Sequence, residues 1–103
     1  MLKKFLSVAG ISGLEENVGD LIKKELKKKV DKIYEDKVGN IISVKGRGKL
    51  KVLITAHMDE VGLIVSHIDK KGFLRFDSVG GIDPRILPSR QVRIHTQKGL
   101  SLI

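Results

Sequence analysis

The chain has 103 residues, with 20 Lys+Arg against 12 Asp+Glu and a formal net charge of +8. This length allows about one small domain with a modest hydrophobic core. The sequence contains no cysteine, which excludes a disulfide framework, a thiolate metal site and a cysteine nucleophile. Histidine, aspartate and glutamate therefore remain as the candidate ligands or catalysts.

The first third of the sequence predicts two helices. Leu2 to Val8 forms a short helical pattern, and Ser12 followed by Glu15 has capping-box spacing, which predicts a second helix running to about Lys29. The spacing of the apolar residues leaves the lysines of this helix on a solvated face. We prefer this interpretation of the positive charge to a nucleic-acid surface, because three Phe, one Tyr and no Trp provide few stacking platforms. The apolar positions are Val18, Leu21, Ile22, Leu26 and Val30.

Beyond Val30 the pattern changes to short strands separated by turns. Strands are predicted around residues 30–34 and 41–44, then at 61–68, 73–79 and 91–96, with Asp69 to Gly72 forming a hairpin turn. Residues 51–56 include a nearly continuous apolar run, which is typical of a central strand covered on both faces. The composition shifts near Asp69, since helices are predicted only before it.

The most informative residues, His57 and Asp59, directly follow this apolar run. In an open α/β sheet, sites form beyond the carboxyl ends of central strands. In an extended chain, residues two apart project to the same side, so Asp59 could orient His57 and leave its other nitrogen free for a metal. Two interpretations stay open from these residues alone: a zinc or cobalt ligand, or a strand-end histidine bonded to a neighbouring carboxylate.

Three further residues are weaker candidates. Glu60 could act as an acid/base or contact a substrate, although a solvated loop carboxylate is the preferred interpretation. His67 and His95 fit exposed or hydrogen-bonded positions on strands better than ligand positions. The segment from Gly80 to Arg85 has the composition of a sharp turn and lacks the spacing of a phosphate loop.

Several short motifs together resemble one known family. The family is that of the di-metal aminopeptidases, which include glutamyl aminopeptidase, the tetrahedral aminopeptidases and the proteins named cellulase or endoglucanase M. The motifs resemble the amino-terminal part of these proteins and occur in the same order. The resemblance covers the chain to about Gly99, and the last residues depart from it, which suggests a truncated or frameshifted reading frame. The motifs are Gly10-Ile11-Ser12-Gly13 with Glu15-Glu16, Asp36 to Asn40, Ala56 to Gly62, Gly72 to Phe76 and Val79 to Arg85.

The resemblance implies an α/β fold with two parts. Residues 1–68 would be the amino-terminal part of a metallopeptidase-type helix/sheet/helix catalytic domain. Residues 69–103 would be the incomplete start of a β-rich inserted domain that makes oligomer contacts. The composition shift near Asp69 fits that start.

The resemblance also implies an activity. Family members remove single residues from peptide amino termini with two zinc or cobalt ions, which activate a bridging water. His57 matches a metal ligand, and Asp59 matches the catalytic residue that orients it. The other ligands of the family match no position in this chain, and a zinc site needs about three protein ligands. We therefore expect the amino-terminal portion of a metal-dependent aminopeptidase that is inactive alone.

The alternative is a non-catalytic assembly or binding module, derived from a truncated peptidase and folded through exposed strand edges. The expected partners are a peptide substrate and further copies of the chain in a homo-oligomer, with neither a membrane nor nucleic acid. No apolar run reaches the roughly 18–20 residues of a membrane span, and the start of the chain lacks a signal-peptide pattern. A cytoplasmic protein is expected.

Overall fold

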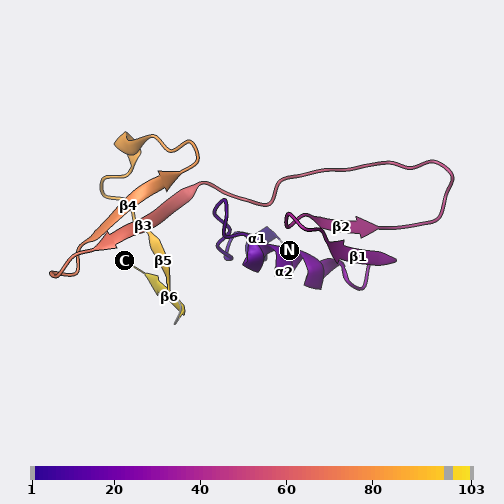
Figure 1. Ribbon diagram of the computed structural model, residues 1–103, viewed down its shortest axis with the longest axis horizontal. Coiled ribbons are helices and arrows are strands. Elements are labelled where there is room, and N and C mark those ends of the chain that lie inside the picture. Colours follow the sequence, from indigo (N-terminus) through magenta and orange to yellow (C-terminus); the bar gives the residue numbers. More distant parts are fainter. Residues whose placement is uncertain (1, 97–98, 103) are drawn as a thin grey trace. The chain divides into compact units, whose positions relative to one another are not determined.

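The computed structural model describes residues 2–96 and 99–102, which fall into two compact units (Figure 1). The first unit extends to Glu60 and the second begins at Val61. The first contains both helices and one strand pair, whereas the second contains the remaining strands and a short 3₁₀ helix. In the described part of the chain, no helix is long and apolar enough to cross a membrane.

The two predicted helices are present but shorter than expected. Helix α1 spans Leu2–Phe5 and helix α2 spans Glu16–Leu26. The predicted start of α2 at Ser12 is wrong: Glu15 occupies the N-cap position, and its carboxylate accepts a hydrogen bond from the Gly13 amide at 2.7 Å. Gly13 has a φ of 87°, a conformation that redirects the chain before the helix begins.

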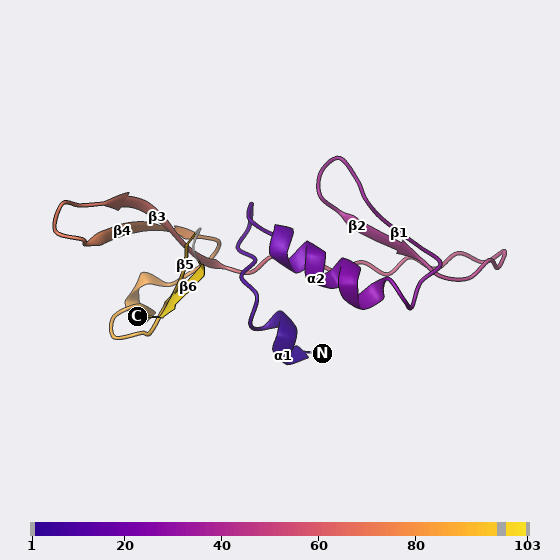
Figure 2. The same cartoon turned by 90° about the horizontal axis from the view of Figure 1, so that it is seen from below.

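The first strand pair confirms the predicted strands on either side of residues 36–40. Strand β1 (Lys32–Glu35) runs antiparallel to β2 (Ile41–Val44). In the turn, the Asp36 carboxylate accepts hydrogen bonds from the amides of Val38 and Asn40 at 3.0 and 2.9 Å. Helix α2 contacts β2 (Figure 2). Gly19 of this helix lies close to the Ile41 side chain.

The predicted central strand at 51–56 does not form. Residues 51–59 are assigned to no helix or strand, and the Val52, Leu53 and Ile54 side chains are 77%, 86% and 89% exposed. The backbone groups of a β-strand need hydrogen bonds to a neighbouring strand, and the described residues supply none to this segment. The sequence therefore encodes strand propensity here, but the pairing partner is absent from the described chain.

The second unit contains two antiparallel strand pairs, and such pairs can be joined by short turns. Strand β3 (Gly62–Ile68) pairs with β4 (Leu74–Val79), which confirms the predicted hairpin through Asp69 to Gly72. The 3₁₀ helix η1 (Pro84–Ile86) follows. Strand β5 (Arg93–Thr96) then pairs with β6 (Gly99–Leu102), a strand that the sequence pattern did not predict.

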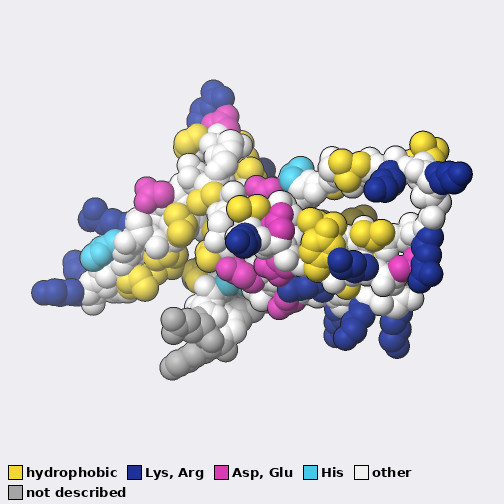
Figure 3. Space-filling view, turned by 45° about the vertical axis from the view of Figure 1, so that its right-hand side comes forward, with side chains coloured by type: hydrophobic (Ala, Val, Ile, Leu, Met, Phe, Trp, Pro, Cys, Tyr) yellow, Lys and Arg dark blue, Asp and Glu magenta, His cyan; other side chains and the backbone are white. Residues whose placement is uncertain are grey.

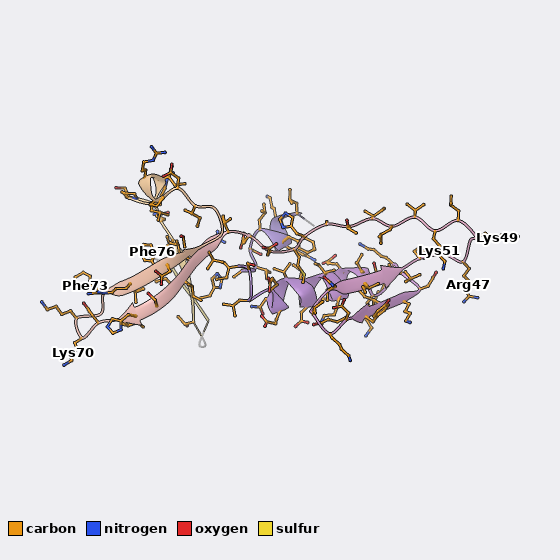
Figure 4. The ribbon with its side chains drawn as sticks, turned by 45° about the horizontal axis from the view of Figure 1, so that its top comes forward. Arg47, Lys49, Lys51, Lys70, Phe73 and Phe76 are labelled. Atoms are coloured by element: carbon orange, nitrogen blue, oxygen red, sulfur yellow. The ribbon has the colours of Figure 1, made fainter. Side chains whose placement is uncertain are left out.

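The β3–β4 hairpin has one predominantly apolar face. The register shifts between Val65 and His67, so that Val65 and Ile68 share a face although they are three positions apart. Phe76 lies opposite Val65 on the same face, where it is 49% exposed (Figure 4). Leu63 and Leu74 complete this face.

Buried apolar volume is small among the described residues. Val18 on α2 is the buried hydrophobic residue, with 7% of its surface exposed. A Cβ placed on Gly10 would collide with the Val18 side chain, so a glycine is required for this close approach. Charged groups spread over the surface (Figure 3), and Lys23 of α2 lies 2.7 Å from Asp20 and 3.0 Å from Glu35.

Candidate metal-ligating site

The segment that carries His57 is fixed at its end to the beginning of the chain. The Glu60 amide donates a hydrogen bond to the Gly10 carbonyl oxygen at 2.8 Å, and Ile11 forms a parallel β-bridge with Glu60. Close packing of Gly10 on Val18 connects the same point to α2. Two contacts at Gly10 thus position the residues that follow the apolar run.

His57 and Asp59 lie side by side, as their spacing in an extended segment predicts. Nδ1 of His57 lies 2.9 Å from Oδ1 of Asp59 and 3.1 Å from the Asp59 carbonyl oxygen. In the tautomer that carries the proton on Nδ1, this nitrogen donates to Asp59 and Nε2 keeps its lone pair. A carboxylate that orients an imidazole in this way is the arrangement found around metal-bound histidines.

The imidazole is accessible, whereas Asp59 is more enclosed. The His57 side chain is 86% exposed and that of Asp59 is 39% exposed. An apolar hollow of about 350 Å³ lies beside His57 and is lined in part by Val18, Ile22 and Met58. The His57 imidazole is therefore open to solvent and borders apolar side chains.

A complete metal centre is not formed by these residues. No group of three or more His, Cys, Asp or Glu side chains that could hold a metal ion occurs within residues 2–96 and 99–102. A zinc ion requires about three protein ligands. His57 fits the role of one ligand oriented by a carboxylate, and the remaining donors would have to come from elsewhere.

The weaker candidates do not join this pair in a ligand group. The Glu60 carboxylate makes no hydrogen bond or ion pair with another described residue. His67 pairs with Arg75 across the β3–β4 hairpin, and His95 lies on β5; both are exposed. The preferred interpretation of the two strand histidines as exposed residues is confirmed.

The segment from Gly80 to Arg85 is a turn, as predicted. The Arg85 guanidinium forms two hydrogen bonds to the Asp83 carboxylate, at 3.0 Å from Nε to Oδ1 and 2.7 Å from Nη2 to Oδ2. The side-chain hydrogen bond from Arg85 holds the pKa of Asp83 below its usual value of 3.8. The Asp83 carboxylate therefore engages the Nε and Nη2 groups of the guanidinium.

The sequence did not predict the packing of Gly10 against Val18, which holds the segment that carries His57 in place. Gly10 belongs to a sequence motif, but its packing against Val18 becomes visible only once α2 is in place. In the sequence, the only indication of this contact was that Gly10 follows a helical pattern. Glycines at such positions more often serve as helix caps. Tertiary contact, rather than local spacing, gives Gly10 its role.

Comparison with known proteins places these features in a family context. The M42 glutamyl aminopeptidase family matches residues 39–103, so the expected departure from the family pattern after Gly99 is wrong. A putative aminopeptidase of Acetivibrio thermocellus is 52% identical over 83 residues, which cover 80% of this chain and 25% of the relative. The lysyl aminopeptidase of Pyrococcus furiosus is 40% identical over 100 residues, covering 96% of this chain and 29% of the relative.

The fold resemblance extends over nearly the whole chain. The TET1 peptidase of Pyrococcus horikoshii, which can assemble into a tetrahedron or a large octahedral shell, is 44% identical, with a TM-score of 0.86. The alignment covers 98% of this chain and 30% of that one. The mixed helix and strand fold therefore matches part of a larger aminopeptidase fold. The chain spans about a quarter to a third of the length of the relatives that it matches.

Proposed function

This chain belongs to the M42 glutamyl aminopeptidase family, and from that premise we propose that it is the amino-terminal portion of a metal-dependent aminopeptidase. Its substrates would be peptides, from which the assembled enzyme removes amino-terminal residues. Residues 1–68 belong to the catalytic domain in this proposal, and residues 69–103 begin a β-rich insertion. A cytoplasmic location is part of the same proposal.

One observation supports the role of the site most directly. Asp59 engages Nδ1 of His57 at 2.9 Å, while the His57 side chain remains 86% exposed. This arrangement keeps Nε2 available as a ligand for zinc or cobalt and fixes the plane of the ring. We assign His57 as one metal ligand and Asp59 as the residue that positions it.

The chain alone would lack activity in this proposal. Two divalent ions need more ligands than the one imidazole that Asp59 orients, and the described residues offer no larger ligand group. We therefore assign no catalytic step to these residues by themselves. Their contribution is to present one oriented nitrogen to a site completed by other parts of an enzyme of this family.

The test uses hydrolysis of amino-acid p-nitroanilides with added zinc or cobalt. We expect no turnover by the 103-residue chain alone, and turnover when the unmatched remainder of the Acetivibrio thermocellus relative is supplied as a separate polypeptide. His57→Ala should abolish the restored activity, whereas the control His67→Ala should retain it. Full activity of the chain alone, or restored activity that survives His57→Ala, would contradict the proposal.

A second function, a non-catalytic assembly module, is favoured by one specific observation. The apolar face of the β3–β4 hairpin leaves Ile68 62% exposed and Phe76 49% exposed, and such faces commonly mark interaction sites. Homo-oligomer formation would cover it. Sedimentation velocity should then show an oligomer that Phe76→Ser dissociates, whereas a monomer at all concentrations would count against this function.

A further inference from the structure

One peptide group links the beginning of the chain to the imidazole of His57. Its N–H, which belongs to Glu60, donates a hydrogen bond to the Gly10 carbonyl oxygen at 2.8 Å. Its carbonyl oxygen, which belongs to Asp59, lies 3.1 Å from Nδ1 of His57. A trans peptide group is planar, and its N–H and C=O point in opposite directions. Holding the N–H on Gly10 therefore also fixes the carbonyl that faces His57.

The backbone around Gly10 packs closely against this peptide group. A Cβ placed on Gly10 would collide with the Val18 side chain and would lie 3.7 Å from the Met58 carbonyl oxygen. Ile11 extends the contact through its parallel β-bridge with Glu60. The geometry of the segment from Met58 to Glu60 therefore depends on how the backbone of Gly10 and Ile11 is held.

A β-turn at residues 11–14 holds this backbone. It is closed by a hydrogen bond from the Leu14 amide to the Ile11 carbonyl oxygen at 2.9 Å. Gly13, the third residue of the turn, has a φ of 87°, the left-handed conformation that a type II turn requires at this position. The Gly13 amide takes no part in the closing hydrogen bond and donates to the Glu15 carboxylate at 2.7 Å instead. Glu15 therefore adds a second hydrogen bond that stabilises the turn.

Glu15 also connects the turn to helix α2. Its carbonyl oxygen accepts a hydrogen bond from the Gly19 amide at 2.9 Å, so its backbone is fixed to the start of the helix. Within the described part of the chain, its side chain makes no capping hydrogen bond to α2 and reaches back to Gly13. The carboxylate of Glu15 thus joins a regular helix to the turn that precedes it.

We propose that Glu15 is a positioning residue for the metal ligand His57. It acts through the turn at residues 11–14, which keeps the Glu60 amide in place and thereby aims the Asp59 carbonyl at Nδ1. When Nδ1 donates its proton to this carbonyl, the lone pair of Nε2 stays available for a metal ion. The inference rests on the proposed role of His57 and adds to it a residue that is distant in sequence.

Asp59 offers two acceptors to Nδ1 of His57, and Glu15 acts on one of them. The carboxylate oxygen lies at 2.9 Å and the carbonyl oxygen at 3.1 Å. The carbonyl is part of the peptide group that Gly10 holds, whereas the carboxylate is attached through rotatable bonds. The effect of Glu15 on the ring should therefore be larger when the carboxylate of Asp59 is removed.

The test compares Glu15→Ala with Glu16→Ala in the metal-free 103-residue chain at pH 8. Both variants remove one carboxylate from the start of α2, so both lose a similar interaction with the helix dipole. Of the two carboxylates, that of Glu15 engages Gly13. The readouts are the ratio of the two His57 ring tautomers, from ¹⁵N NMR, and the hydrogen-exchange rate of the Glu60 amide.

Glu15→Ala should increase the ratio of Nε2-protonated to Nδ1-protonated imidazole about threefold and speed exchange of the Glu60 amide about fivefold, because the turn loses a hydrogen bond. Glu16→Ala should change either value less than about 1.5-fold. Glu15→Gln keeps an acceptor oxygen and should restore most of both values. In the background of Asp59→Ala, which retains the backbone carbonyl, Glu15→Ala should change the tautomer ratio about fivefold.

Glu15→Asp is a second variant that does not weaken the helix. Aspartate is a preferred N-cap residue, so its shorter side chain should cap α2 rather than reach Gly13. This variant keeps the negative charge and should still reproduce the effects of Glu15→Ala on the His57 tautomers and on the Glu60 amide. Amide NMR signals of β1 and β2 verify that each variant retains the fold of the first unit.

Three results would overturn the inference. An unchanged tautomer ratio in Glu15→Ala and Glu15→Asp would leave Glu15 with a structural role in the turn alone. Equal effects of Glu15→Ala and Glu16→Ala would assign the change to charge at the start of α2. An effect of Glu15→Ala that does not grow in the Asp59→Ala background would exclude the route through the peptide group. Because both readouts come from the metal-free chain, their failure is distinguishable from failure of the p-nitroanilide assay.

Discussion

The imidazole Nδ1 of His57 lies 2.9 Å from Oδ1 of Asp59, and the same nitrogen lies 3.1 Å from the Asp59 carbonyl oxygen. Both acceptors belong to one residue, so they favour a single proton position on the ring. In the proposed role of His57 as a metal ligand, the orientation of its imidazole would depend on a carboxylate that does not itself contact the metal. The contact between His57 and Asp59 can be tested on the 103-residue chain by itself.

Asp59→Ala should change the tautomer of His57. In the parent chain at pH 8, we expect the proton to reside predominantly on Nδ1, because Asp59 accepts it. Removing the carboxylate should increase the fraction with the proton on Nε2, as measured by ¹⁵N NMR of the ring nitrogens. Glu60→Gln is the control, and a similar change in both variants would contradict an orienting role for Asp59.

Gly10→Ala should destabilise the first unit by about 1–3 kcal/mol, because the added Cβ collides with Val18 and forces local rearrangement. Urea unfolding measures this free energy. Gly48→Ala is the matched control, since a Cβ there meets only the Leu50 carbonyl oxygen at 3.9 Å. In the background of Val18→Ala the cost of Gly10→Ala should shrink, and an unchanged cost would show that the collision is not its cause.

Acid should loosen the turn between β1 and β2. Hydrogen bonds from the Asn40 side chain and backbone lower the pKa of Asp36 from its usual 3.8. A lowered pKa in the folded state contributes stability above the unfolded-state value, and this contribution is lost as pH falls through the folded value. The Val38 and Asn40 amide signals should report loosening below about pH 3.8, whereas Asp36→Asn should remove this titration step. Identical pH profiles would refute the prediction.

Gly80→Ala should weaken the β3–β4 hairpin. Gly80 has a φ of 82°, and a Cβ there would lie 2.7 Å from Cγ1 of Val61. The left-handed conformation alone costs an alanine about 1–2 kcal/mol. The neighbouring Gly81→Ala is the control, because nothing lies within 4 Å of a Cβ at that position. Faster amide exchange in β3 and β4 should occur in the first variant, and equal exchange in both would disprove the argument.

Local patterns predicted much of the fold because their interactions are close in sequence. The β3–β4 hairpin needs only a short turn and a few cross-strand contacts, so the turn from Asp69 to Gly72 indicates it directly. Gly39 likewise indicates the turn between β1 and β2. The start of α2 was less predictable. Ser12 and Glu15 have capping-box spacing, but the Glu15 side chain bonds to Gly13 instead.

By itself, the sequence determined the β3–β4 hairpin, the strands β1 and β2, the existence of α2 and the proximity of His57 and Asp59. Side chains two apart in an extended segment project to one side. Tertiary structure alone decided that residues 51–56 lack a partner among the described residues and that Gly10 packs on Val18. The physical reason is the separation along the sequence of the residues that interact. A turn or an (i, i+2) contact is set by neighbouring dihedral angles, whereas strand pairing and close packing depend on segments brought together across the fold.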